Sequence, residues 1–304
     1  MPTLLSANRS DEQAKTMAIL TAGLASLLVA LTVVVTRGIV DRIDPLLLGF
    51  LRYAPAGVFF VPALILRTKD IAARDWWPMI GLGVMFYGLY PWLFSAALNF
   101  TTALHAALII TLMPMITLVI GVLTRTEQLQ PAKVLGISLA IGGVITAFSE
   151  SFFKEQNLPD RALTGDLIML FAVFLSALFN VGSQRFVKRY SALTVTAVCM
   201  TSGSVVLLIS VASTGLLPAI NELTAPDWKI LAFLCLGGAL LGNLLWVFAL
   251  GLTAPSRVAV FAMFPPVGVA ALGMLLLGEI PSTIALCGLA LVLAGIYTTQ
   301  LGRN

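Results

Sequence analysis

The chain alternates between long apolar runs and mostly short polar links. We place apolar segments at residues 17–37, 46–66, 76–98, 103–123, 132–149, 165–186, 193–214, 228–250, 256–277 and 282–301. Each is about 18 to 23 residues long, the length that an α-helix needs to cross roughly 30 Å of hydrocarbon. The runs are unbroken, whereas the strands of a membrane β-barrel alternate polar and apolar residues over about ten positions. The pattern predicts an all-α integral membrane protein with ten transmembrane helices.

Composition narrows the class of protein further. Hydrophobic residues make up 59% of the 304 positions and charged residues only 11%, against roughly 25% charged residues in an average soluble protein. These values exclude a soluble enzyme, a disordered chain and a secreted disulfide scaffold. The net charge of +4 could suggest nucleic acid as a partner, but the 18 Lys and Arg are scattered between apolar runs. Membrane topology uses basic residues in this way, so we expect the lipid bilayer and no nucleic acid as a partner.

The distribution of basic residues predicts the orientation of the chain. With the N-terminus in the cytoplasm, twelve of the 18 Lys and Arg fall on the cytoplasmic side and five on the opposite side, while Arg52 lies within a span. Cytoplasmic loops carry the excess of basic residues in membrane proteins. We therefore predict a multi-pass protein of the inner (plasma) membrane with both termini in the cytoplasm. Residues 1–16 form a cytoplasmic N-terminal segment, and the apolar run that follows is too long for a cleavable signal peptide.

The chain contains an internal repeat. Sliding it against itself by 152 residues aligns Asp75-Trp76 with Asp227-Trp228, Thr101 with Thr253, His105 with Arg257, Pro114 with Pro266, Glu127 with Glu279, Gly136 with Gly288 and Gly143 with Gly295. The halves are then residues 17–149 and 165–304, joined by an extracytoplasmic linker at 150–164. Because each half has five spans, an odd number, the second half enters the membrane upside down. Inverted repeats of this kind are typical of secondary transporters.

The motifs within this repeat point to a family. Each half contains a proline in the middle of its fourth span, a Glu at the end of that span, and a glycine-rich fifth span, seen as "LMPMITLVIGVLTRTEQLQPAKVLGISLAIGGVI" and "MFPPVGVAALGMLLLGEIPSTIALCGLALVLAGI". This pattern resembles the EamA-type repeat of the drug/metabolite transporter superfamily, over nearly the full chain. The resemblance implies ten helices around a central cavity and the export or exchange of a small metabolite.

Arg52 is the most informative charged residue. If its helix begins near Pro45, Arg52 lies about 10 Å along the axis, inside the bilayer. An arginine facing lipid at that depth costs a few kcal/mol, so we expect it to face the protein interior or a water-filled cavity. A guanidinium binds carboxylates and phosphates with two parallel hydrogen bonds, which makes Arg52 a candidate substrate-binding residue. The alternative is a structural role, with backbone carbonyls or Asp44 as partners.

Three prolines are candidates for kinks or gates. Pro114 lies near the middle of the segment 103–123, and Pro265 and Pro266 lie near the middle of 256–277. A proline inside a helix leaves the carbonyl four residues earlier without its N–H partner, here Ile110, Phe261 and Ala262. A freed carbonyl inside a membrane protein must find another partner. The sequence predicts either related kinks that line the cavity and bend during transport, or static kinks that shape packing.

Further candidate substrate-binding residues are aromatic or amide side chains within the spans. They are Tyr87 and Tyr90 in the third span, Asn180 in the sixth, and Asn243 and Trp246 in the eighth. Tyr and Trp combine apolar area with a hydrogen-bonding group, so they can line a cavity or simply pack. Asn180 shares a helix face with Ser176 and Gln184, and this polar stripe can bind a substrate or neighbouring helices.

No pattern of residues in the sequence indicates catalysis or a cofactor. His105 is the only histidine, and no His, Cys and carboxylate cluster has the spacing of a metal site. His105 could take up a proton near neutral pH or be an interfacial polar residue. Walker-type and other catalytic motifs are absent, so we expect no ATP hydrolysis, no catalytic residue, no metal and no cofactor.

The leading hypothesis is a secondary transporter of small organic metabolites, amino-acid-like or amphipathic compounds, that works by alternating access. The alternative is a membrane-embedded enzyme acting on a lipid-linked substrate, which would need paired acids or histidines near one interface.

Overall fold

A computed structural model describes residues 2–301, apart from 68, 70, 127–130, 154–160, 254, 256–257, 259–260, 262–264, 279 and 281. Glu127, Glu279 and Arg257 lie outside the described residues. The helices are α1 Pro2–Ile39, α2 Pro45–Arg67, α3 Ala73–Gly83, α4 Tyr90–Phe100, α5 Ala103–Ile110, α6 Met113–Leu123, α7 Pro131–Phe153, α8 Ala162–Tyr190, α9 Ala192–Ser213, α10 Ala225–Phe233, α11 Asn243–Leu252, α13 Pro265–Leu277 and α14 Thr283–Leu301.

The helices confirm the all-α membrane fold. Seven helical stretches in the described residues are long and apolar enough to span a bilayer, among them Thr16–Ile39 and Ala73–Phe100. Three shorter apolar helices, Val134–Gly143, Gly268–Leu277 and Thr283–Gly295, fall within the remaining predicted spans. Helix α1 begins at Pro2, although we expected the helix to begin at residue 17. No Gly or Pro interrupts residues 3–22, so the helix continues beyond the apolar run.

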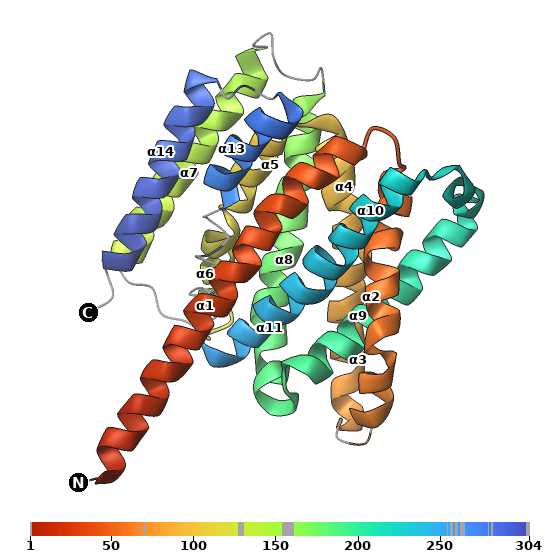
Figure 1. Cartoon of the computed structure of the whole chain (residues 1–304). Coiled ribbons are helices and arrows are strands. Elements are labelled where there is room, and N and C mark those ends of the chain that lie inside the picture. The colour runs from red at the N-terminus through yellow and green to blue at the C-terminus, as the bar shows by residue number, and fades with distance from the viewer. Residues whose placement is uncertain are drawn as a thin grey trace.

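The two five-helix halves pack against each other through pairs of equivalent helices. Helix α7 packs along α14, and α2 packs along α9, so each of these pairs joins equivalent helices of the two halves. Helix α1 contacts α11 and α13, while its counterpart α8 contacts α4 and α6. Figure 1 shows the α7–α14 pair at one side of the bundle and α2, α3 and α9 at the other. Each half therefore contributes helices to both sides of the central region.

Each half contains a π-helical segment at the equivalent position of its third span. The third span contains a π-helical segment at Val84–Leu89, and the eighth contains one at Leu234–Gly242. These segments overlap when the chain is shifted by the repeat offset of 152 residues. A π-helix leaves some backbone groups without their usual α-helical partners and is frequently found at functional sites. Its presence in both repeats indicates that these spans have a common role.

Two ion pairs join the halves at opposite ends of the bundle. Arg42, which follows α1, contacts Asp227 on α10 at 2.8 Å, and Arg189 at the end of α8 contacts Asp75 on α3 at 2.9 Å. Asp75 and Asp227 are repeat equivalents, and each bonds an arginine from the other half. Figure 1 shows the start of α3 and the start of α10 at opposite ends of the molecule, as inversion of the second half requires.

The candidate substrate cavity

A cavity of about 80 Å³ lies between the two halves. Its walls come from α1, α2, the third and eighth spans, the break between α5 and α6, and α8. The lining residues are Ser26, Leu28, Val29, Thr32, Arg52, Tyr53, Phe86, Tyr90, Pro91, Phe94, Ile110, Met113, Ser176, Gly238, Gly242, Asn243 and Trp246. Most of this wall is apolar or aromatic, with a few polar groups, as in pockets that bind small organic molecules.

Arg52 lies in the cavity wall and is 2% exposed. Its Nη1 donates to Thr36 Oγ1 at 3.3 Å, and its guanidinium stacks over the rings of Tyr53 and Phe94 at 5.6 and 5.4 Å. Among the residues that the structure describes, Arg52 has no carboxylate partner, and its Nε is buried without a hydrogen bond. A buried cation without a counter-charge is costly. Arg52 therefore retains the capacity to bind an anion.

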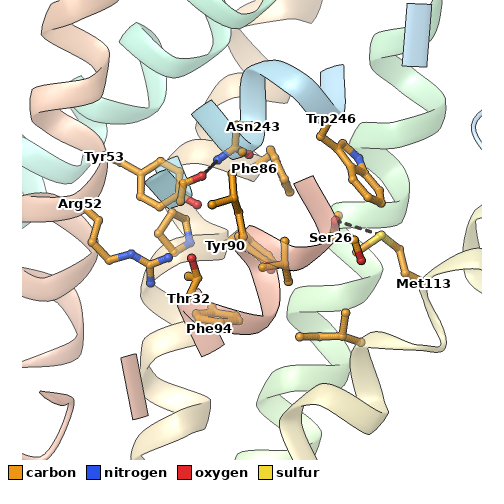
Figure 2. Close-up of a pocket in the computed structure, with 17 residues that line it drawn as sticks. Ser26, Thr32, Arg52, Tyr53, Phe86, Tyr90, Phe94, Met113, Asn243 and Trp246 are labelled. Atoms are coloured by element: carbon orange, nitrogen blue, oxygen red, sulfur yellow. Dashed lines mark hydrogen bonds between the residues drawn. The ribbon is translucent and has the colours of Figure 1, made fainter. Parts of the chain in front are cut away.

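Asp44 and Thr32 affect which hydrogen-bonding groups are available at the end of the cavity that contains Arg52. Asp44, the alternative partner for Arg52, instead accepts from the backbone N–H of Leu46 and Leu47 and caps α2. The hydroxyl of Thr32 also lines the cavity and has no hydrogen-bond partner in the described part of the chain. Figure 2 shows the guanidinium of Arg52 extending toward Thr32. This end of the cavity thus has two hydrogen-bond donors available to a ligand.

The opposite wall is built around Trp246. The indole Nε1 of Trp246 donates to Asn180 Oδ1 at 2.9 Å, and Asn180 Nδ2 donates to Met113 Sδ at 3.3 Å. Asn180 is fully buried behind the cavity surface and holds both neighbours in place. Figure 2 shows Trp246 and Met113 well separated from Arg52 and Tyr53, with Tyr90 and Phe86 between them. The cavity therefore has one polar end and one apolar end.

Asn243 is held by the π-helical segment that precedes it. Its Nδ2 donates to the carbonyls of Gly238 and Ala239 at 3.2 and 3.0 Å, which occupies both of its N–H donors. This hydrogen bonding orients the amide. It leaves Oδ1 as an acceptor at the cavity wall.

Pro114 lies at the start of a half-helix and does not kink a continuous one. The fourth span breaks at Thr111 and Leu112, and Pro114 follows as the second residue of α6. Pro265 is the first residue of α13. A proline in the first helical turn needs no N–H partner, which is why the half-helix starts there. The freed carbonyl of Phe261 accepts a hydrogen bond from Ser26, which answers the expectation that such carbonyls find new partners.

The other predicted residues lie apart from the cavity surface. Tyr87 is fully buried and packs on Tyr53, Phe86 and Phe179 behind the wall, so its position is that of a core residue. Gln184 donates to the carbonyl of Thr253, away from the cavity lining. Sequence reasoning overlooked Thr32, Tyr53 and Met113 because no periodic signal distinguishes a cavity-facing residue from a core residue in a helix that is apolar all round.

His105 belongs to a second buried polar cluster. Its Nδ1 lies 3.3 Å from Asp166 Oδ2, and Thr101 donates to Asp166 Oδ1 at 2.6 Å. No sequence pattern connects Asp166 with His105, since they are 61 positions apart in the chain. Among the described residues, no group of three or more His, Cys, Asp and Glu could hold a metal ion.

The EamA-like transporter family matches residues 16–149 and again residues 163–300. The chain belongs to the EamA-like transporter family. The double match agrees with the two halves of the fold and confirms the resemblance to the drug/metabolite transporter superfamily. As an EamA-like protein, the chain is a multi-pass membrane protein of a transporter family, and its family does not suggest an enzyme.

Similar proteins agree with this assignment. A probable amino-acid metabolite efflux pump from Salmonella typhimurium is 28% identical, over 90% of this chain and 94% of its own length. A probable terminal-alkyne amino-acid exporter from Streptantibioticus cattleyicolor is 27% identical, over 79% of each chain. One solved crystal structure superposes with a TM-score of 0.67, at 18% identity, over 95% of this chain and 97% of the other. That structure supports the fold.

Proposed function

We propose that this EamA-like protein is a secondary transporter that exports or exchanges amino acids with apolar side chains by alternating access. The observation that carries the proposal is the buried guanidinium of Arg52, which lines the cavity without a carboxylate partner among the described residues. A substrate carboxylate would supply the missing negative charge. Two relatives whose names include amino-acid export support the same class of substrate.

The polar groups of the cavity suit a zwitterion. Arg52 and Thr32 donate hydrogen bonds to the carboxylate, and charge-assisted bonds of this kind are among the stronger ones in proteins. The ammonium group binds Asn243 Oδ1 and the face of the Tyr90 ring, since a cation is attracted to an aromatic face. The substrate side chain packs against Trp246 and Met113. The carboxylate, the ammonium group and the side chain of the amino acid thus each have a complementary group in the cavity.

The test of this proposal measures transport of an amino acid against its amide. Purified protein in liposomes is assayed for counterflow exchange of L-leucine, with L-leucinamide as a competitor that lacks the carboxylate. Arg52→Ala should lower leucine exchange by about tenfold or more, because it removes a charge-assisted hydrogen bond. Arg52→Lys keeps the charge without the planar fork and should lose less. Competition by leucinamide should not weaken in either variant.

Arg185→Ala is the matched control. Arg185 also stacks over an aromatic ring, that of Phe186 at 4.5 Å, but it is exposed and lies outside the cavity lining. Leucine exchange should be unchanged in this variant. If Arg52→Ala weakens leucine and leucinamide binding equally while the protein stays folded, Arg52 has a structural role and the proposal fails.

A further inference from the structure

We propose that Asp75, Arg189 and Tyr190 form a latch that closes one end of the substrate path and releases once in each transport cycle. The latch joins the end of α8 to the start of α3, at the end of the bundle opposite to the Arg42–Asp227 pair (Figure 1). Its place in the cycle rests on the proposed transport function, while the latch itself rests on contacts between described residues.

Tyr190 is bonded into the start of α3. Its hydroxyl donates to Asp75 Oδ2 at 2.5 Å and accepts from the backbone N–H of Ala72 at 3.2 Å. Arg189 Nη1 donates to the same carboxylate oxygen at 2.9 Å, and its guanidinium lies 5.2 Å from the centre of the Tyr190 ring. Separation of α8 from α3 at this end must therefore break several contacts together.

The equivalent end of the other half is joined more weakly. Asp227 Oδ2 accepts from the N–H and the hydroxyl of Thr224, which completes a capping box within α10 itself. The repeat counterpart of Thr224 is Ala72, which has no hydroxyl, so Tyr190 from the other half takes that place. At the α10 end the ion pair is made by Arg42, whose side chain is 56% exposed. Because exposed ion pairs contribute little stability, this end opens more easily than the latch.

Ser191, which directly follows the latch, has a strained backbone. It is the single residue between α8 and α9, with φ 84° and ψ 156°, a region adopted almost only by glycine. Strain of this kind persists where the surrounding contacts impose it. Here the latch fixes the end of α8, and the Ser191 side chain caps α9 by accepting from the N–H of Thr194. Release of the latch lets the turn relax, so the strain favours opening.

The two elements that the latch joins also border the cavity. Ser176 on α8 and Phe86 in the third span are lining residues. Beyond the cavity these elements pack closely: the ring of Phe86 stacks on Phe179 with centroids 4.2 Å apart, and a Cβ on Gly182 would lie 2.9 Å from Leu82 Cδ2. The end of α8 lies about 20 Å beyond Ser176 along the helix. The latch therefore closes the far end of an interface that begins at the cavity.

The latch is tested first by access to the cavity, without reference to a substrate. With the native cysteines replaced, Ser176→Cys places one thiol in the cavity wall. An impermeant cationic methanethiosulfonate is added to right-side-out or inverted membrane vesicles. Tyr190→Phe removes a hydrogen bond from the latch and should raise labelling about fivefold from the face where α8 ends, without raising it from the other face. Unchanged labelling, or an equal rise from both faces, would overturn the latch.

Arg185→Gln is the matched control for Tyr190→Phe. Arg185 lies near the same end of α8, but its guanidinium contacts the ring of Phe186 and not Asp75. Labelling of Ser176→Cys should therefore equal that of the wild-type latch. A rise in Arg185→Gln as large as that in Tyr190→Phe would show a general loosening of this end and would contradict the latch.

Two substitutions at Ser191 separate strain from helix capping. Ser191→Gly and Ser191→Ala both lose the cap on α9, but only glycine adopts the positive φ without strain. Ser191→Gly should therefore give slower labelling from the face where α8 ends than Ser191→Ala does. Equal labelling of the two variants would contradict the role of strain in opening.

The place of the latch in the cycle is tested by locking it in the leucine liposomes. Cysteines at Asp75 and Tyr190, in the same cysteine-free background, are joined by a bifunctional methanethiosulfonate. Leucine exchange should be lost on cross-linking and return on reduction, while either single cysteine with the same reagent should keep exchange. Exchange that persists in the cross-linked protein contradicts release of the latch during transport. Absence of leucine exchange in wild type would instead contradict the proposed substrate, and the labelling of Ser176→Cys would still decide the latch.

Discussion

At the scale of single residues, the hydrogen bond between Trp246 and Asn180 shapes the apolar wall of the cavity. Asn180→Leu removes the acceptor and leaves the largely buried Nε1–H of Trp246 unpaired. An unsatisfied buried donor costs about 1–3 kcal/mol. We expect a lower unfolding temperature in detergent and weaker leucine exchange. In a Trp246→Phe background the same change should cost less, because no indole N–H remains; equal losses in both backgrounds would contradict a direct interaction.

At the scale of elements, the broken fourth span is the feature most open to test. Pro114→Ala restores an N–H that can bond the carbonyl of Ile110, so α5 and α6 can join into one continuous helix. We expect slower leucine exchange with little loss of folded protein. Pro62→Ala is the matched control, since Pro62 lies inside α2, which continues through it, and is exposed. Normal exchange by folded Pro114→Ala would show that the break serves packing alone.

At the scale of the whole molecule, inversion places the two ion pairs between the halves on opposite faces of the membrane. In a background with Cys199, Cys235 and Cys287 replaced, single cysteines at Asn221 and Lys188 report on the two faces; both positions are exposed. An impermeant maleimide should label Asn221→Cys on intact cells and Lys188→Cys only after permeabilisation, because the excess of basic residues stays in the cytoplasm. Labelling of both from the same side would contradict the topology.

The arrangement of the ends is consistent with this topology. The apolar part of α1 begins, and α14 ends, at the same end of the bundle (Figure 1). An even number of spans requires this. The labelling experiment decides which end faces the cytoplasm.

The sequence by itself determined the membrane class, the repeat and the family resemblance. Apolar length alone determines which segments can cross a bilayer, and residue identities at a constant offset of 152, such as Pro114 with Pro266, reveal the duplication. Burial of Arg52 could also be expected from the sequence. A charged side chain at that depth in the bilayer is costly when it faces lipid, so it turns toward the protein interior.

Only the tertiary structure decided which residues share a site. Tyr87 and Tyr90 are three positions apart in one span, yet Tyr90 lines the cavity and Tyr87 packs behind it. Tyr87 lies within the π-helical segment and Tyr90 directly after it, and the helices packed against each side determine that difference. Asp166 meets His105 only because α8 packs on the junction of α4 and α5 through Gly165. Such contacts join residues far apart in sequence, and in helices that are apolar on every face the sequence pattern does not reveal which face meets a cavity.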